Sequence, residues 1–150
     1  MRKVIVSEPE TRKTPLKVVG EDVTILGGDD QAKPFEVHIQ HGAEGGGPPP
    51  HHHPWEEAFY VLDGSVEVTV NEETSVLHRG AFVQIPANTV HAYRNVSETA
   101  TILGIVSDSR GGRLFEAMDR EVKSLPDDLP NLLSLSERYG VEWAFNNDTR

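Results

Sequence analysis

Apolar and polar residues alternate in a series of short stretches between Leu16 and Val106. Such alternation places every second side chain on one face of an extended strand. The stretches follow one another about every 8–12 residues and are separated by turn-forming residues, which is typical of an antiparallel sandwich or barrel. The predicted strands cover residues 16–19, 23–26, 35–41, 58–62, 65–70, 74–77, 81–85, 90–95 and 99–106.

The stretch from Phe35 to His41 alternates most strictly, with apolar residues at odd positions and polar residues at even positions as far as Gln40. One face of this strand is therefore expected to meet packed core. The other face presents Glu36, His38 and Gln40 to water or to a polar cavity. For His38 both alternatives stay open, a place beside a site or simple exposure.

Two further predicted strands, residues 58–62 and 65–70, are separated by Asp63 and Gly64. Asp-Gly between alternating apolar residues is a strong local signal for a tight turn. We therefore expect these two strands to pair directly as a hairpin.

From Ser109 onward the apolar residues recur at helical spacing rather than strand spacing. Gly111-Gly112 predicts a turn before the first helix, and Gly140 is expected to end the second helix as the residue after its last turn. The apolar positions that indicate the two helices are Leu114, Phe115, Met118 and Val122, followed by Leu132, Leu133 and Leu135.

A chain of 150 residues suits one domain that buries roughly two-thirds of its unfolded surface. We divide it into an N-terminal arm (1–14), a β domain (15–108) and a helical extension (109–150). The extension is expected to pack on the β domain or on a partner. The predicted fold class is all-β with two short C-terminal α-helices.

Composition excludes several classes of function. The chain has no cysteine, which rules out disulfides, thiolate catalysis and cysteine-based zinc sites. Its net charge of −10 disfavours binding to nucleic acid and to anionic membranes. The N-terminal sequence has neither the apolar length of a membrane span nor that of a signal peptide, so we expect a cytoplasmic protein.

The chemistry of the chain is concentrated in residues 45–64, which read GGGPPPHHHPWEEAFYVLDG. Residues two apart in a strand share a face about 6.6 Å apart, so His51 and His53 can point toward one site while His52 points away. Glu57 has the same parity but lies roughly 13 Å farther along a straight strand. A bend at Pro54 is therefore expected to bring it back. Two imidazoles and a carboxylate suit a transition metal, and a fourth ligand is expected elsewhere in the chain.

Two motifs in this chain resemble those of the cupin superfamily, and residues 35–106 carry the resemblance. The family usually has glycine where this chain has Asn88. Asparagine is well able to adopt positive φ, so the turn is expected to survive. The nine matching positions are Gly45, His51, His53, Glu57, Gly64, Gly80, Pro86, His91 and Asn95.

The resemblance to single-domain cupins implies a small antiparallel jelly-roll β-barrel with one metal ion inside it. The implied ligands are His51, His53, Glu57 and His91, which leave coordination positions open at a divalent transition metal, whether Fe, Mn, Ni, Cu or Zn. The family resemblance also implies a homodimer. An apolar N-terminal stretch and the C-terminal helices could bury surface on the second copy.

Three functions are compatible with such a site. The first is a dioxygenase, similar to the quercetin-dioxygenase-like cupins, that acts on a small chelating substrate of phenolic or diketone-like type, with Glu57 as the base. The second is an isomerase, cyclase or lyase that uses the metal only as a Lewis acid. The third is a non-catalytic protein that binds a small ligand or the metal itself. We favour the oxidoreductase.

Several side chains share the parity of the ligands or align with them across the barrel, and they are candidates for a substrate pocket. The same side chains would also serve as ordinary core, and the two interpretations do not exclude each other. The candidates are His38, Phe59, Val61, Phe82 and Tyr93.

Overall fold

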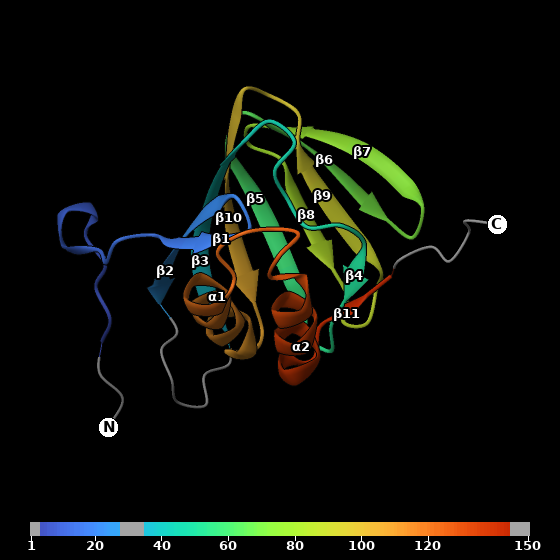
Figure 1. The fold of residues 1–150 in the computed structure, drawn as a ribbon. Helices are drawn as coiled ribbons and strands as arrows, with labels where there is room; N and C mark the ends of the chain where they lie inside the picture. The colour runs from blue at the N-terminus through green and yellow to red at the C-terminus, as the bar shows by residue number, and fades with distance from the viewer. Residues whose placement is uncertain (1–3, 28–34, 145–150) are drawn as a thin grey trace.

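The computed structural model describes residues 4–27 and 35–144, which form two antiparallel sheets and two helices (Figure 1). One sheet has six strands in the order β1-β2-β3-β10-β5-β8, and the other has five in the order β11-β4-β9-β6-β7. The strands are β1 (Leu16–Val18), β2 (Glu21–Gly27), β3 (Glu36–Ala43), β4 (His51–His52), β5 (Glu57–Asp63), β6 (Ser65–Val70), β7 (Glu73–His78), β8 (Phe82–Ile85), β9 (His91–Asn95), β10 (Thr99–Val106) and β11 (Glu142–Trp143).

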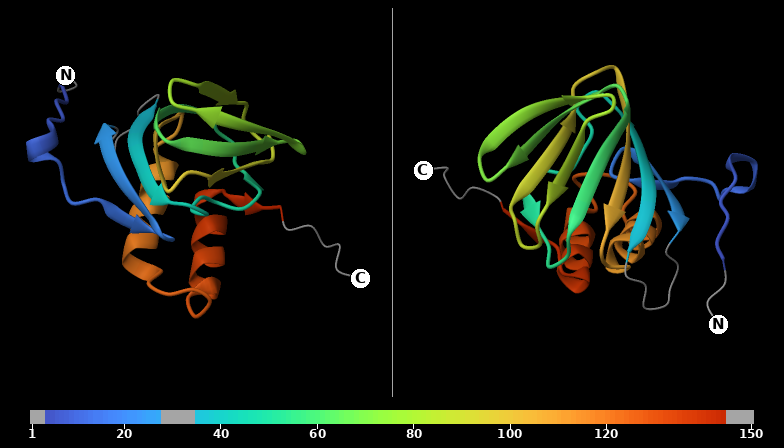
Figure 2. Two further views of the ribbon diagram at one scale, coloured as in Figure 1. Left: turned by 90° about the horizontal axis from the view of Figure 1, so that it is seen from above. Right: turned by 180° about the vertical axis from the view of Figure 1, so that it is seen from behind.

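The two sheets face one another, and the two helices lie together at one end of them (Figure 2). An apolar core fills the space between the sheets and includes Phe59, Val61 and Ile85. The predicted all-β class, antiparallel pairing and two C-terminal helices are confirmed. Strand pairing among the described residues leaves the sheets separate, so a closed barrel is not shown.

Three turns contain residues with a left-handed backbone. Val19 and Gly20 have φ of 47° and 86° and connect β1 to β2, while Asn71 has φ of 47° and begins the turn from β6 to β7. Asn88 has φ of 60°, as the expectation for this position requires. Its N–H donates to the carbonyl of His53 over 2.8 Å, so this turn supports the histidine loop.

The expected hairpin across Asp63 and Gly64 is wrong. β5 pairs with β10 and β8, whereas β6 pairs with β7 and β9, so the turn carries the chain from one sheet to the other. Gly64 has φ of 73° and lies so close to the carbonyl of Thr99 that a Cβ there would be 2.3 Å from its oxygen. Local turn residues indicate a reversal of the chain, but they do not decide whether the flanking strands pair.

The two faces of β3 are the reverse of the expectation for packed core. Glu36, His38 and Gln40 point inward and are buried, while Val37 and Ile39 are half-buried on the outer face. The alternation is correctly predicted, and the polar residues lie inside rather than in water. Gln40 lines a cavity, whereas Glu36 and His38 are buried without lining it. Periodicity assigns residues to two faces without stating which one is inside.

The helices α1 (Arg110–Glu121) and α2 (Leu129–Tyr139) cover one end of the six-stranded sheet, and α1 packs against β1 (Figure 1). Gly111 and Gly112 belong to the first turn of α1 rather than to a preceding turn, which corrects the expectation. Gly140 ends α2 with φ of 86°, as predicted. Neither described helix has the length and apolar character that a membrane span requires.

Candidate metal centre and cavity

The chain bends at Pro54, between His53 and Glu57, and passes there from one sheet to the other. His51 lies on β4 of the five-stranded sheet, whereas Glu57 begins β5 of the six-stranded sheet. His91 begins β9 and pairs with His51 across the ladder. The carboxylate therefore reaches the imidazoles from the facing sheet, which is how a residue too distant along a straight strand returns to them.

The structure brings His51, His53, Glu57 and His91 into one cluster whose potential ligand atoms all lie within 4.8 Å of one another. Oε2 of Glu57 is 2.9 Å from Nε2 of His53 and 3.0 Å from Nε2 of His91. His52 lies outside this cluster and faces Glu142 at 3.6 Å.

Each histidine of the cluster is oriented by a backbone carbonyl two residues away. Nδ1 of His51 lies 2.9 Å from the carbonyl oxygen of Pro49. The corresponding distances are 3.1 Å from Nδ1 of His53 to Trp55 and 2.8 Å from Nδ1 of His91 to Thr89. A carbonyl oxygen only accepts, so Nδ1 must carry the proton in all three rings. The unprotonated Nε2 of each neutral ring is thus left for a metal.

In this arrangement hydrogen-bond acceptors of His53, His91 and Glu57 face one another, and a positive charge between them would stabilise the cluster. In neutral rings with a proton on Nδ1, Nε2 of His53 and His91 would face the carboxylate of Glu57 acceptor to acceptor. Burial raises the pKa of Glu57, but hydrogen bonds from His53 and His91 outweigh it and hold that pKa well below the usual range. Burial lowers the pKa of His91, yet Glu57 leaves it raised overall. A proton or a bound cation resolves the conflict.

The four residues fit a divalent transition metal. Two ligand atoms that each lie about 2.1 Å from a metal and subtend roughly 90° are about 3.0 Å apart, which matches the separations of Glu57 from His53 and His91. Three imidazoles and one carboxylate are a donor set that Fe, Mn, Ni, Cu and Zn all accept. The ligand atoms do not choose among these ions.

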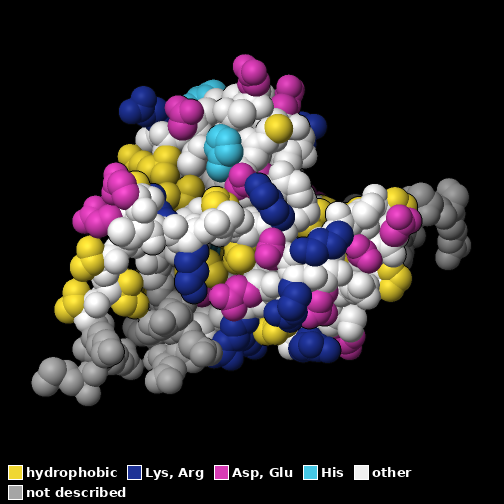
Figure 3. Space-filling model, turned by 60° about the vertical axis from the view of Figure 1, so that its left-hand side comes forward, with side chains coloured by type: hydrophobic (Ala, Val, Ile, Leu, Met, Phe, Trp, Pro, Cys, Tyr) yellow, Lys and Arg dark blue, Asp and Glu magenta, His cyan; other side chains and the backbone are white. Residues whose placement is uncertain are grey.

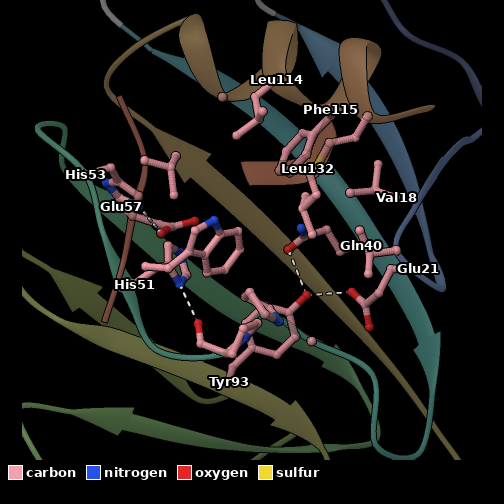
Figure 4. A pocket seen from close by; sticks show the side chains of 18 of the residues that line it. Val18, Glu21, Gln40, His51, His53, Glu57, Tyr93, Leu114, Phe115 and Leu132 are labelled. Carbon is pink, nitrogen blue, oxygen red and sulfur yellow. Dashed lines mark hydrogen bonds and ion pairs between the residues drawn. The ribbon is translucent and has the colours of Figure 1, made fainter. Parts of the chain in front are cut away.

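The cluster borders a cavity of about 270 Å³, near the lower end of ligand pockets, which span roughly 300–1,000 Å³. His51, His53 and Glu57 lie on one side of it, and Glu21 and Gln40 lie on the other (Figure 4). Apolar side chains from the helices close the remaining wall; they include Leu114, Phe115, Met118, Leu132 and Leu133.

The five predicted pocket residues have different positions. Phe59 and Tyr93 line the cavity, with ring centroids 5.5 Å apart. Val61 is fully buried in the core between the sheets. His38 is buried behind the cavity wall, edge-on to Phe115 at 5.2 Å. The structure places Phe82 on the outer face with 58% exposure, so its expected pocket position is wrong: its side chain has the outward parity of β8.

Glu21 is a cavity residue that the sequence analysis missed, because it falls between the predicted strands 16–19 and 23–26, in a segment expected to be a turn. The turn is shorter, and Glu21 already pairs with Val18 as the first residue of β2. Its parity with buried Val23 was the signal that could have placed it inside. Trp143 also escaped prediction, since β11 contains only two residues. Its ring lies beside that of His51, with centroids 5.5 Å apart and the planes tilted by 48°.

Residues 35–106 match the model of the cupin domain. The chain is 31% identical over 98 residues to quercetin 2,3-dioxygenase of Bacillus subtilis, covering 65% of this chain and 25% of the relative. It is 33% identical over 52 residues to an uncharacterized protein of Streptomyces coelicolor, covering 35% of this chain and 50% of the relative. The chain thus spans half or less of these curated relatives.

Solved structures share the fold at low sequence identity. A RmlC-like cupin from Shewanella frigidimarina superimposes with a TM-score of 0.61 and 19% identity, covering 67% of this chain and 87% of the other. The polyketide cyclase RemF from Streptomyces resistomycificus gives a TM-score of 0.56 and 23% identity, covering 71% and 78%. At these identities the similarity concerns the fold alone.

Proposed function

This chain carries a cupin domain and has the fold of the cupin superfamily, and we propose that it is a metal-dependent dioxygenase acting on a small chelating substrate of phenolic or diketone-like type. One observation carries the proposal: a cluster of three histidines and Glu57 opens into a largely apolar cavity. A chelating molecule can reach the cluster there while its apolar part stays out of water. The similarity to quercetin 2,3-dioxygenase supports the choice of reaction.

The two oxygens of Glu57 have different surroundings. Oε2 contacts His53 and His91, while Oε1 forms no hydrogen bond with any described residue. A metal held by the cluster supplies Lewis acidity and, if redox-active, a route for electrons to dioxygen. Oε1 is then free to take the proton of a substrate hydroxyl or of an enolisable carbon as the substrate binds.

A Lewis-acid function is the second candidate, because the same site without redox chemistry would serve a cyclase, isomerase or lyase. The fold itself is compatible with such an activity, since the polyketide cyclase RemF shares it. A protein that only binds a small ligand or the metal is the third. On the face shown in Figure 3, basic side chains are interspersed with acidic ones, which supports a small-molecule partner rather than nucleic acid.

Metal analysis and oxygen uptake separate these functions. Protein purified without added metal is assayed for bound metal, then reconstituted with each ion and screened in an oxygen electrode against catechols, flavonols and diketones. Substrate-dependent oxygen uptake with a redox-active ion supports the dioxygenase. Turnover with zinc and no oxygen uptake supports the Lewis-acid function instead. His51→Ala should lose stoichiometric metal and His52→Ala should keep it, since only the first belongs to the cluster.

We also propose that the protein forms a homodimer through the outer face of the six-stranded sheet. Paired positions on four adjacent strands form an apolar row on this face. A row of this kind is typical of a protein interface. The N-terminal arm extends away from the sheets with Val4 and Val6 88% and 73% exposed, and it could cover the same face of a second copy (Figure 1). The row consists of Phe82, Tyr60, Leu103 and Ile39.

A further inference from the structure

The side of the cavity opposite the metal cluster carries a second group of polar side chains. Glu21 from β2, Gln40 from β3 and Tyr93 from β9 line it, and all three are more than nine-tenths buried (Figure 4). The hydroxyl of Tyr93 lies 2.5 Å from Oε2 of Glu21 and 3.2 Å from Oε1 of Gln40. Asn95 donates from Nδ2 to Oε1 of Glu21 over 2.7 Å.

The backbone leaves room for the carboxylate of Glu21. A Cβ at Gly42 would lie 2.3 Å from Oε1 of Glu21, and one at Gly46 would lie 2.7 Å from the same atom. Two glycines therefore leave the space that the carboxylate occupies, and its hydrogen bonds with Tyr93 and Asn95 hold it there. A carboxylate fixed in this way can recognise a ligand with defined geometry.

Glu21 has fewer partners than a buried carboxylate ordinarily needs. Its oxygens accept one hydrogen bond each from Tyr93 and Asn95, and it forms no ion pair with a described residue. A buried carboxylate offers about four acceptor positions, and burial of the charge is costly unless they are used. The cavity side of Glu21 is therefore ready to accept a further hydrogen bond.

Gln40 also has unused capacity toward the cavity. Tyr93 has a single hydroxyl proton, and the shorter distance to Glu21 directs that proton to the carboxylate. Whichever way the amide of Gln40 is turned, its other polar atom has no hydrogen-bond partner among the described residues.

We propose that Glu21, Gln40 and Tyr93 form a subsite for a hydroxyl group at the far end of an apolar ligand, one whose other end lies at the metal cluster. A hydroxyl both donates and accepts, so it can donate to Glu21 and still pair with Gln40 in either orientation of the amide. Only the assignment of the near end to a metal-chelating group depends on the function proposed above.

Other end groups fit this subsite less well. A carboxylate would be repelled by Glu21, and a methyl group would leave the carboxylate and the amide unpaired. An ammonium could pair with Glu21, but it would lose its hydration inside a cavity whose walls are formed by Leu114, Phe115 and Leu132. The neutral hydroxyl avoids this loss.

Catechols with different tails test the subsite, since the catechol end is a chelator. The tails are hydroxyethyl, propyl and aminoethyl, which have the same length, together with phenyl tails with and without a para-hydroxyl for a longer reach. Binding is measured by calorimetry on the full chain loaded with zinc and kept free of oxygen, so that no redox turnover interferes. The variants are Glu21→Gln and Gln40→Leu, with Glu67→Gln on the exposed face of β6 as the control.

In the wild type, at least one hydroxyl tail should bind about tenfold or more tightly than its apolar counterpart, the scale of one buried hydrogen bond to a charged group. Glu21→Gln and Gln40→Leu should each reduce this preference to within about threefold, while Glu67→Gln keeps it. Gln40→Leu leaves the bond between Tyr93 and Glu21 in place, so it tests the subsite even if Glu21→Gln fails to fold.

The proposal is overturned if the wild type has no preference for either hydroxyl tail, if aminoethyl binds more tightly than hydroxyethyl, or if folded variants keep the wild-type preference. The same titrations without zinc show whether binding of the catechol end depends on the metal, which the proposed dioxygenase requires. A hydroxyl preference that persists in protein lacking oxygen-dependent turnover leaves the subsite intact and removes only the dioxygenase.

Discussion

Glu57 is the residue at which metal binding and catalysis can be separated. Glu57→Gln keeps the size and one carbonyl oxygen but removes the charge and the basicity. With excess metal we expect the variant to retain much of its metal and to lose roughly 10² or more in kcat, the scale of general-base catalysis. Turnover and metal content are measured on the same preparation. Glu56→Gln is the control, because Glu56 is exposed and its Oε1 only accepts from the N–H of Ala87 at 3.4 Å. Near-wild-type kcat in metal-replete Glu57→Gln would exclude the base role.

A second buried acid, Glu36, should make stability depend on pH. Burial, together with Glu116 and Asp108, raises the pKa of Glu36 from 4.5 to about 8. Between these values the folded protein holds a proton that the unfolded chain has released, so the free energy of unfolding falls as pH rises. The slope is about 1.4 kcal/mol per pH unit. Burial lowers the pKa of His38 from 6.5 to about 4, which opposes this trend below pH 6.5.

The contribution of Glu36 should therefore be seen between pH 6.5 and 8. Glu36→Gln has no proton to lose, so it should remove this decline and be more stable than the wild type toward pH 8. Urea denaturation of both proteins at several pH values gives the two slopes. Equal slopes would show that Glu36 ionises normally in the folded protein.

The sequence predicted which residues meet in the cluster of three histidines and Glu57 better than it predicted the rest of the cavity. His51, His53, Glu57 and His91 share strand parity or a motif spacing, and the only further requirement was the bend at Pro54. Glu21 comes from a distant strand, and only the packing of β2 against β3 places it near Gln40. The odd or even position of a residue assigns it to one face of its own strand. It does not say which strands line the same cavity.

At the scale of whole elements, the approach of α1 to β3 depends on one glycine. A Cβ at Gly112 would lie 2.2 Å from Oε2 of buried Glu36, whereas a Cβ at Gly111 would meet nothing nearer than 3.5 Å, at Val106. Gly112→Ala should destabilise the protein by about 1–3 kcal/mol through overpacking. Gly111→Ala, one residue away in the same helix, should be neutral or stabilise it by up to about 1 kcal/mol.

Urea denaturation of both variants measures the difference. Addition of Glu36→Ala to Gly112→Ala removes the overlapping carboxylate and should recover part of the loss. If Gly111→Ala and Gly112→Ala have the same stability, the close approach of α1 to Glu36 is not what selects glycine here.

Elements that depend on local chemistry were predictable, and those that depend on distant partners were not. Alternation located the longer strands but not the two-residue strands β4 and β11, and Gly140 marked the end of α2. In contrast, Gly111 and Gly112 carry a turn signal because glycine usually interrupts helices, yet both lie in α1, and the packing against Glu36 requires glycine at position 112. The turn at Gly64 was predicted to be a hairpin from its local residues alone. The flanking strands instead pair with distant strands, β5 with β10 and β6 with β9, and so belong to different sheets.

For the molecule as a whole, the apolar residues of β3 lie on the outer face of the six-stranded sheet, where a second copy of the chain could cover them. Tyr60 is 41% exposed in the middle of the outer row, between Phe82 and Leu103. A homodimer that buries this row would desolvate it on both copies, and at such a twofold interface each change acts twice. A lysine at position 60 would place two like charges in the interface, whereas it would be solvated in a monomer.

Light scattering coupled to size exclusion, over a range of protein concentrations, tests this prediction. The wild type should have twice the mass of one chain, and Tyr60→Lys should raise the dissociation constant by about tenfold or more. Val76→Lys is the matched control, because Val76 is 50% exposed on β7 in the other sheet. A monomeric wild type at all concentrations would remove the dimer. Equal dissociation constants for the two lysine variants would place the interface elsewhere, because only the row on the six-stranded sheet distinguishes them.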